Sequence, residues 1–274
     1  MKPTALVTGG TSGLGAAAAI ALAQANYKVL IAGRDAGRGA EVVAQIGARG
    51  GDAEFLVADL LGKRGVSALA DEVKRRTQQL ALLVNNAGGS FQKRENTPDG
   101  IERTFALNTL APFQLSEALL PQLAAARGRI VNVATGIPKG TKVEVDQLSN
   151  PKKYSGFAAY SNAKLALIAL TLEQSARHSA QGVTAVCMHP GIILGTRFGG
   201  DIPKPVLAIM GVVAKVFRMN STLDQAAQRF LVAASSTAPS GTFFDQDRVG
   251  TPPKQAQDPG FRSQLWTLLT DHSK

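Results

Sequence analysis

Short apolar runs alternate with longer alanine-rich stretches along almost the whole chain, and this alternation constrains the fold more than any other feature of the sequence. Several of the short runs are apolar at nearly every position, which is typical of strands buried on both faces of a parallel sheet. Strands that alternate with helices predict a doubly wound sheet with right-handed crossovers. We therefore expect one α/β domain over residues 1–274, with a parallel sheet of about seven strands and helices on both faces.

The expected elements follow one another in a regular order. The predicted strands are Thr4–Thr8, Lys28–Ala32, Ala53–Ala58, Leu80–Val84, Arg129–Ala134, Val183–Met188 and Thr242–Phe244. The predicted helices are Leu14–Ala25, Gly37–Ala48, Val66–Arg76, Asp99–Arg127, Ala158–His178 and Leu223–Ser235. Two stretches interrupt this order: a polar insertion at residues 136–156 and a long stretch, rich in apolar residues and glycine, at residues 191–221. Because long irregular segments in compact domains are often functional, we expect the second stretch to cover a substrate.

The cysteine and histidine content excludes several kinds of site. Cys187 is the one cysteine, so no disulfide can form within the chain, and three scattered histidines do not complete a metal site. No apolar run reaches the ~20 residues that span a bilayer, and the N-terminal Met1–Thr4 predicts no signal or transit peptide. We expect a cytoplasmic protein with no metal and no stable membrane insertion.

The charge balance allows two interpretations. Thirty Lys and Arg residues against twenty Asp and Glu residues give a net charge of +10, which a nucleic-acid or anionic-membrane partner would explain. A scattered basic surface with a local patch for a phosphorylated cofactor would explain it as well. The basic residues stand singly or in short pairs, such as Arg75-Arg76 and Lys152-Lys153, without interleaved aromatic residues. We favour the second interpretation and expect no nucleic-acid partner.

A glycine-rich segment, Thr8–Gly15, lies where the first strand ends and the first helix begins. Tight turning and the close approach of a pyrophosphate both require residues without side chains, and a helix N-terminus offers free N–H groups to phosphates. Glycines also collect in ordinary turns, but the position directly after a buried strand favours a dinucleotide site on a Rossmann-type sheet. The expected cofactor contacts are Gly9, Thr11, Ser12, Gly13, Leu14 and Gly15.

The end of the second strand predicts which dinucleotide binds. An NAD site normally has an acidic residue there, ~20 residues past the loop, which bonds the ribose hydroxyls. Here Gly33 stands at the strand end, and the Arg34 guanidinium that follows can pair with the 2′-phosphate of NADP. The alternative is that Arg34 is solvated and Asp35 only caps the next helix. We favour NADP(H) and expect Asp59 and Leu60, after the third strand, to contact its adenine, with helix capping as the alternative for Asp59.

Tyr160 and Lys164 lie four residues apart, which places both on one face of a predicted helix. A tyrosine has an ordinary pKa near ~10, too high for proton exchange at neutral pH. An ammonium ~6 Å away should lower that pKa by about two units, which would make Tyr160 a general acid in reduction and a general base in oxidation. Taken alone, this spacing is common, and a half-buried tyrosine beside a surface lysine is the simpler interpretation.

The order of these motifs resembles that of the short-chain dehydrogenase/reductase family over nearly the whole chain. The glycine loop has the spacing of that family, and the segment Asn85–Gly88 matches a motif that supports the sheet and the adenine side of the cofactor. This match implies cofactor contacts at Asn86, Ala87 and Gly88. Tyr160 and Lys164 match the catalytic pair of the family, in which the lysine also holds the nicotinamide ribose.

The resemblance implies three further parts of the site. Asn108 matches the structural and proton-relay asparagine of the family. Pro190-Gly191, followed by Thr196, matches the segment that closes over the nicotinamide. The hydroxyl that steadies the substrate oxygen is usually a serine after the fifth strand, but here that residue is Thr135. Threonine keeps a hydroxyl donor and acceptor, while its methyl group stiffens the side chain.

The insertion points to a branch of the family. Thr135 and Tyr160 are 25 residues apart, farther than is usual, and Lys153-Tyr154-Ser155-Gly156 resembles the retinol-dehydrogenase and protochlorophyllide-reductase branch. That branch handles large lipophilic molecules and often prefers NADP. Family members build a variable substrate loop where residues 191–221 lie, so Val206–Phe217 predicts a lid rather than a membrane contact. The helices over Asp99–Arg127 and Ala158–His178 resemble those that pair in family members, which implies a homodimer or homotetramer.

These inferences lead to one main functional hypothesis and two alternatives. We expect an NADPH-dependent oxidoreductase that transfers hydride to a carbonyl of a fairly lipophilic small molecule, with Tyr160 as the proton donor. Within the same class, the chain would instead reduce an activated C=C bond. In another class, it would be a non-catalytic NADP-binding sensor or scaffold protein. Such proteins usually lose the tyrosine or the lysine, and this chain keeps both.

Overall fold

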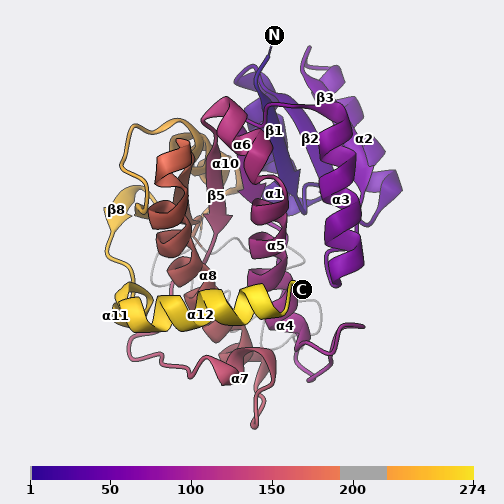
Figure 1. Cartoon of the computed structure of the whole chain (residues 1–274). Coiled ribbons are helices and arrows are strands. Elements are labelled where there is room, and N and C mark those ends of the chain that lie inside the picture. Colours follow the sequence, from indigo (N-terminus) through magenta and orange to yellow (C-terminus); the bar gives the residue numbers. More distant parts are fainter. Residues whose placement is uncertain (1, 192–220) are drawn as a thin grey trace.

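The computed structural model describes residues 2–191 and 221–274 (Figure 1). Its strands are β1 (Thr4–Thr8), β2 (Lys28–Gly33), β3 (Asp52–Val57), β4 (Leu82–Asn85), β5 (Arg129–Val133), β6 (Thr184–His189), β7 (Phe243–Asp245) and β8 (Arg248–Gly250). Within this part of the chain they form one sheet in the order β3-β2-β1-β4-β5-β6-β7-β8, parallel from β3 to β7 and antiparallel between β7 and β8. The predicted doubly wound α/β sheet is confirmed. Strand β8 was not predicted, because its three residues are too few to show an alternating pattern.

The helices alternate with the strands as expected. They are α1 (Gly13–Gln24), α2 (Ala36–Gly47), α3 (Lys63–Arg76), α4 (Arg103–Phe105), α5 (Ala111–Ala118), α6 (Leu120–Ala126), α7 (Asp146–Ser149), α8 (Gly156–His178), α10 (Leu223–Ser235), α11 (Lys254–Gln257) and α12 (Pro259–Asp271). The polar insertion contains α7 and otherwise lacks regular structure over residues 136–145 and 150–155.

The prediction of one continuous helix over Asp99–Arg127 is wrong. The helix begins only at Arg103, because Gly100 has a φ of 78° and closes a turn in which its N–H donates to the Thr97 carbonyl. A π-helical turn, Ala106–Leu110, then separates α4 from α5. A second break separates α5 from α6, where Pro121 in the first turn of α6 has no N–H to continue the helix.

Each face of the sheet is covered by its own set of helices. Ala5 and Val7 of β1 point into the core beneath α1, α2 and α10, whereas Leu6 between them points into the core beneath α3, α5 and α6. A third core lies under α8, α11 and α12 at the β5–β7 side of the sheet. Because successive side chains of a strand point to opposite faces, the nearly continuous apolar runs of the sequence fill all of these cores.

Helix α12, which the sequence analysis did not predict, lies across α8 (Figure 1). Trp266 of α12 packs edge-on against Phe113 of α5, with ring centroids 5.0 Å apart, and lies under the guanidinium of Arg177 of α8 at 4.4 Å. Helix α12 therefore covers part of the outer surface of α8, one of the two helices expected to pair between subunits. The expected homodimer or homotetramer stays a prediction.

Within residues 2–191 and 221–274, none of the helices combines the length and the hydropathy that a membrane crossing requires. The predicted lid at Val206–Phe217 and most of the predicted substrate-covering stretch at residues 191–221 lie outside the described residues.

Candidate active site

The carboxyl ends of four neighbouring strands form the edge at which the predicted site residues meet. Thr8 ends β1, Asn85 ends β4, Val133 ends β5 and His189 ends β6, and these strands pair side by side in parallel. The strand order reverses at β1, because β2 and β3 lie on one side of it and β4 to β7 lie on the other. Open α/β sheets bind their ligands outside the carboxyl ends of the strands at such a reversal point.

The loop between β1 and α1 is shaped by its own backbone. Gly9 and Gly13 have φ values of 65° and 51°, in the left-handed region that favours glycine. A Cβ on Gly15 would lie 2.2 Å from the carbonyl oxygen of Gly9, which no packing allows. Ser12 precedes α1, but among the described contacts its side chain makes no capping hydrogen bond, so the first-turn N–H groups are open to an anion. A backbone folded this tightly around an open helix N-terminus fits a dinucleotide pyrophosphate.

Asn86 fastens this loop to the end of β4. Its side-chain Nδ2 donates to the carbonyl oxygens of Thr8 at 2.9 Å and Gly9 at 3.3 Å. The Thr8 hydroxyl accepts from the backbone N–H groups of Asn86 and Ala87, both at 3.0 Å, and donates to the Val84 carbonyl. The Asn86 side chain therefore supports the glycine loop, and Ala87 is held against the same loop, while their predicted contacts with the cofactor stay predictions.

Gly33, Arg34 and Asp35, at the end of β2, each have a different environment. A Cβ on Gly33 would lie 2.6 Å from Cγ2 of Thr11, so glycine lets the strand end approach the loop. Asp35 caps α2, accepting from the Arg38 N–H at 3.1 Å, and pairs with the Arg38 guanidinium at 3.3 Å. Arg34 is exposed beside them. The cap that the sequence analysis held as an alternative for Asp35 is thus present, and it leaves Arg34 facing solvent at the strand end.

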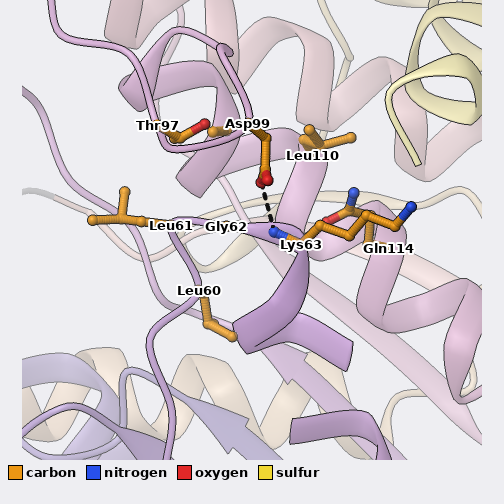
Figure 2. A pocket seen from close by; sticks show the side chains of 9 residues that line it. Leu60, Leu61, Gly62, Lys63, Thr97, Asp99, Leu110 and Gln114 are labelled. Atoms are coloured by element: carbon orange, nitrogen blue, oxygen red, sulfur yellow. Dashed lines mark hydrogen bonds between the residues drawn. The ribbon is translucent and has the colours of Figure 1, made fainter. Parts of the chain in front are cut away.

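Asp59 and Leu60 lie in the connection from β3 to α3. Asp59 is exposed, and its carboxylate accepts from the Leu61 N–H at 3.1 Å, which fixes a turn. Leu60 lines a small hollow between the start of α3 and the π-helical turn, together with Thr97, Asp99, Leu110 and others (Figure 2). The cap of α3 comes from Asp99, which accepts from the Lys63 N–H at 2.7 Å. The capping alternative for Asp59 is therefore wrong.

Asn108 is buried in the π-helical turn and holds the loop that follows β4. Its Nδ2 donates to the carbonyls of Thr104 at 2.7 Å and Gly89 at 2.8 Å, and its Oδ1 accepts from the Gly89 N–H at 3.3 Å. Gly88, the predicted cofactor contact, comes directly before the residue that Asn108 holds. Single π-helical turns inside α-helices frequently mark functional sites, and this one aims the Asn108 amide at the loop after β4.

The predicted catalytic side chains come together where β5 meets α8. Tyr160 and Lys164 lie one turn apart on α8, and the Lys164 Nζ is 5.8 Å from the centroid of the Tyr160 ring. Thr135, two residues past the end of β5, is hydrogen-bonded to the Tyr160 hydroxyl. Lys164 is buried and donates to the Val133 carbonyl at 2.7 Å. A phenol, a hydroxyl and an ammonium thus share one corner of the sheet edge.

The expectation that the pKa of Tyr160 lies below its ordinary value is wrong, because in the structure this pKa is raised. Burial raises the pKa of Tyr160, and its hydrogen bond with Thr135 opposes that effect only in part. Burial also lowers the pKa of Lys164 to about 8, because the residue is only 3% exposed and its ammonium loses hydration. Tyr160 therefore keeps its proton through neutral and mildly alkaline pH, which suits a proton donor.

The Pro190–Gly191 turn follows β6, the strand next to β5. Its position is tied to the catalytic corner, because the Ala134 N–H, next to Thr135, donates to the Met188 carbonyl at 2.8 Å. Gly191 has a φ of 92°. Thr196, the remaining predicted nicotinamide contact, lies outside the described residues.

Two residues of this region were not assigned a role from the sequence. Arg229 of α10 donates to the Pro190 carbonyl at 2.6 Å. Tyr154, at the end of the insertion, donates to the Phe91 carbonyl at 2.6 Å and lies within hydrogen-bond distance of Thr104 and Glu102. Tyr154 stood in the branch motif, which was a signal for it, whereas a single arginine in an amphipathic helix carries none. Within the described residues, no group of three or more His, Cys, Asp or Glu side chains could hold a metal ion.

The chain is similar in sequence to a known protein family and to characterised proteins. Residues 3–205 match the family model described as "short chain dehydrogenase". The chain is 31% identical to mouse (Mus musculus) retinol dehydrogenase 14 over 282 residues, covering 97% of this chain and 84% of that protein. It is 38% identical to mouse polyprenol dehydrogenase over 198 residues, covering 69% of this chain and 59% of that protein.

The fold is also similar to solved structures. One of them is a metagenomic short-chain oxidoreductase in complex with NADP, with a TM-score of 0.64 and 24% identity, covering 91% of this chain and 97% of that one. At this level of identity the likeness concerns the fold.

Proposed function

The chain belongs to the short-chain dehydrogenase family, and we propose that it is an NADPH-dependent oxidoreductase that reduces the carbonyl of a fairly lipophilic small molecule. The observation that carries the proposal is the meeting of Tyr160, Thr135 and Lys164 at the carboxyl edge of the sheet. This corner shares its edge with the glycine loop after β1, where the open helix N-terminus fits a pyrophosphate.

The three side chains have separate tasks in this proposal. Tyr160 holds a proton on its hydroxyl at neutral pH and delivers it to the oxygen of the reacting carbonyl. Thr135, bonded to that hydroxyl, orients it and offers its own hydroxyl to the same substrate oxygen. Lys164 places a positive charge below the phenol ring and favours the phenolate that remains after proton transfer. NADPH, when bound, supplies the hydride.

Arg34 supports the choice of NADPH over NADH. The carboxylate nearest to the end of β2 belongs to Asp35, which is engaged with Arg38 and the first turn of α2. The exposed Arg34 guanidinium therefore remains for a 2′-phosphate, because two of the terminal phosphate oxygens match its forked N–H groups. Thr11, Gly13 and Leu14 would supply the neighbouring backbone contacts, and Asp59, Leu60, Ala87 and Gly88 would line the adenine and ribose.

The substrate class rests on the relatives and on composition. The two relatives are named for retinol and polyprenol, which are long apolar alcohols. Residues 191–221 of this chain are rich in apolar side chains and glycine, as suits a segment that contacts a lipophilic molecule. We propose the same class of substrate here, bound as the aldehyde or ketone.

A cofactor-oxidation assay tests the proposal. The full chain would be mixed with NADPH and a panel that pairs long apolar aldehydes and ketones with short polar ones, and the loss of NADPH absorbance would be followed with product analysis. We expect turnover with the long apolar carbonyls and an alcohol product. A product that keeps its carbonyl and loses a C=C bond would assign the chain to the C=C reductases. NADPH binding without turnover on any substrate would favour a sensor or scaffold.

A further inference from the structure

We propose that Arg229 is a positioning residue that fixes the Pro190–Gly191 turn for the nicotinamide half of the cofactor; this role rests on the proposed function. Arg229 lies on α10 and is 8% exposed, although the guanidinium always carries a charge. Burying a charge is unfavourable unless partners satisfy it. The partners of Arg229 therefore show what the residue is there to hold.

The guanidinium of Arg229 joins three parts of the chain. Its Nε and Nη2 donate to the two carboxylate oxygens of Asp247, at 2.7 and 2.6 Å. Its Nη1 donates to the Pro190 carbonyl and to the Ser221 hydroxyl, both at 2.6 Å. Pro190 and Ser221 lie on either side of the stretch of residues 192–220, so Arg229 contacts a backbone carbonyl before it and a side-chain hydroxyl after it.

The Asp247 carboxylate orients the guanidinium. A planar guanidinium bound at two oxygens can neither rotate nor slide, so the remaining Nη1 must point at Pro190. Arg229 in turn holds the pKa of the Asp247 carboxyl below its ordinary value, so this partner carries its negative charge at neutral pH. A lysine would have one nitrogen for all three partners and could not reproduce this geometry.

The backbone at Gly191 is adapted to this contact. Its φ of 92° is a conformation that other residues rarely adopt. A Cβ at this position would lie 2.2 Å from Oγ of Ser221 and 2.8 Å from Nη1 of Arg229. The turn can therefore approach the guanidinium only because residue 191 has no side chain, and the Pro190 carbonyl is held in one orientation.

The turn is linked to the catalytic corner but lies far along the chain from the adenine side of the site. Pro190 follows β6, which pairs with β5, the strand that ends two residues before Thr135, whereas Arg34 follows β2 at the other side of β1. The proposed nicotinamide contacts should therefore depend on Arg229, and the proposed adenine and 2′-phosphate contacts should not.

Binding of two ligands to three proteins separates these effects. The full-length wild type, Arg229→Lys and Arg248→Lys would be titrated with NADPH and with 2′-phospho-ADP-ribose, which lacks the nicotinamide ring. Arg248 is the matched control, because it is an exposed arginine of the same region that pairs only with Asp245 among the described ion pairs. We expect Arg229→Lys to bind NADPH about tenfold more weakly, the range of one lost charge-assisted hydrogen bond, and to bind 2′-phospho-ADP-ribose as wild type does.

Asp247→Asn keeps the shape of the partner and removes its charge, so it should show the same selective loss even if Arg229→Lys folds poorly. Equal losses for the two ligands, or no loss for either, would overturn the role of Arg229 and leave the proposed function standing. Failure of the wild type to bind NADPH would overturn the proposed function and this role together.

Discussion

The loop at the end of β1 and the corner at the ends of β5 and β6 lie at the same edge of the sheet, but they are constructed in different ways. The loop is made of backbone: Gly9 and Gly15 touch each other, and Asn86 binds main-chain carbonyls. The corner is made of side chains, with Thr135, just past the end of β5, brought together with Tyr160 and Lys164 of α8.

This difference separates binding from chemistry. A backbone cradle offers N–H groups to a phosphate without a titratable group, so its effect should depend little on pH. The corner contains a phenol and an ammonium whose pKa values are shifted by burial, which is typical of groups selected for proton transfer. Changes in the loop should therefore alter affinity and stability, and changes in the corner should alter turnover.

The largest effect is expected for Tyr160→Phe, which removes the proton donor and keeps the ring. Loss of general acid catalysis should reduce turnover by about 10²–10⁴-fold, while NADPH affinity stays nearly unchanged. Steady-state kinetics and a cofactor titration on the same preparation would measure both. Tyr27→Phe, a half-buried tyrosine beyond α1, is the matched control. If Tyr160→Phe retained most of the wild-type rate, the chemistry would have to be assigned to another group.

Gly15→Ala tests the backbone-made loop. The added Cβ would meet the Gly9 carbonyl at 2.2 Å, so the loop must shift. Overpacking of this kind costs about 1–3 kcal/mol, and a clash with backbone should lie at the upper end of that range. Urea unfolding and NADPH titration should show lower stability together with weaker binding.

Gly47→Ala is the control for that variant, because the new Cβ would have open space around it. Gly47 lies in the last turn of α2, where alanine is the better helix former by roughly 0.5–1 kcal/mol. It should therefore stabilise the chain slightly. Wild-type stability and affinity in Gly15→Ala would mean that the loop is less tightly constrained than its contacts indicate.

Lys164→Met tests whether the buried charge of Lys164 lowers the free energy of unfolding of the chain. Burial lowers the pKa of Lys164 to about 8, so the charged form is disfavoured in the folded chain by up to about 3 kcal/mol. This penalty is fully present below pH ~8 and disappears as the pH rises towards the ordinary pKa of lysine, ~10.4. Methionine removes the charge at similar length, although the Val133 carbonyl loses its donor.

We therefore expect Lys164→Met to unfold at higher urea concentration than wild type at neutral pH, with the gain shrinking above pH ~8. Turnover should be lost in the same variant. Urea denaturation across this pH range would measure the first effect. If Lys164→Met were less stable than wild type at neutral pH, the Lys164 ammonium would be shown to stabilise the corner. The corner would then resemble the loop after β1 in contributing to stability.

The fold could be predicted well from the sequence because its signals are local. The strand Thr4–Thr8 and the helix Leu223–Ser235 have the predicted bounds, since each is a sharply delimited apolar or amphipathic run. Helix α12 was missed because its sequence, beginning Pro259-Gly260, carries a turn signal, and its position depends on packing of Trp266 against Phe113. The break at Ala106–Leu110 was missed because α and π turns suit the same residues.

The residues of the site could be predicted from the sequence better than the hydrogen bonds that join them. Glycine spacing and the Tyr160–Lys164 pair are visible in sequence because one turn of loop or helix sets their geometry. The hydrogen bond between Tyr160 and Thr135 and the contact from Arg229 to Pro190 join residues 25 and 39 positions apart. Only the folded sheet edge brings these pairs together. The direction of the Tyr160 pKa shift was also misjudged, because burial has the largest effect on the pKa of both Tyr160 and Lys164.

The last prediction concerns Arg34→Ala, which tests the loop side of the comparison at the end of β2. Asp35 is held by α2 and Arg38, so Arg34 is the charged group that we propose meets a 2′-phosphate. A charge-assisted contact of this kind contributes about 1.5–3 kcal/mol, or roughly 10–150-fold in affinity. Wild type should therefore prefer NADPH to NADH by at least about tenfold in kcat/KM, and Arg34→Ala should lose most of this preference by using NADPH less well.

Arg49→Ala is the control for Arg34→Ala, because it removes an equal charge from another exposed position and should leave the preference intact. Kinetics with both cofactors on all three proteins would measure it. A wild-type preference for NADH would mean that Asp35 leaves Arg38 and takes the ribose hydroxyls. Unchanged discrimination in Arg34→Ala would place the 2′-phosphate on another base, of which Arg38 is nearest along the chain. In either case a rearranged side chain would select the cofactor on the loop side. The loop would then act through its backbone only where it meets the pyrophosphate, and the contrast with the catalytic corner would hold only there.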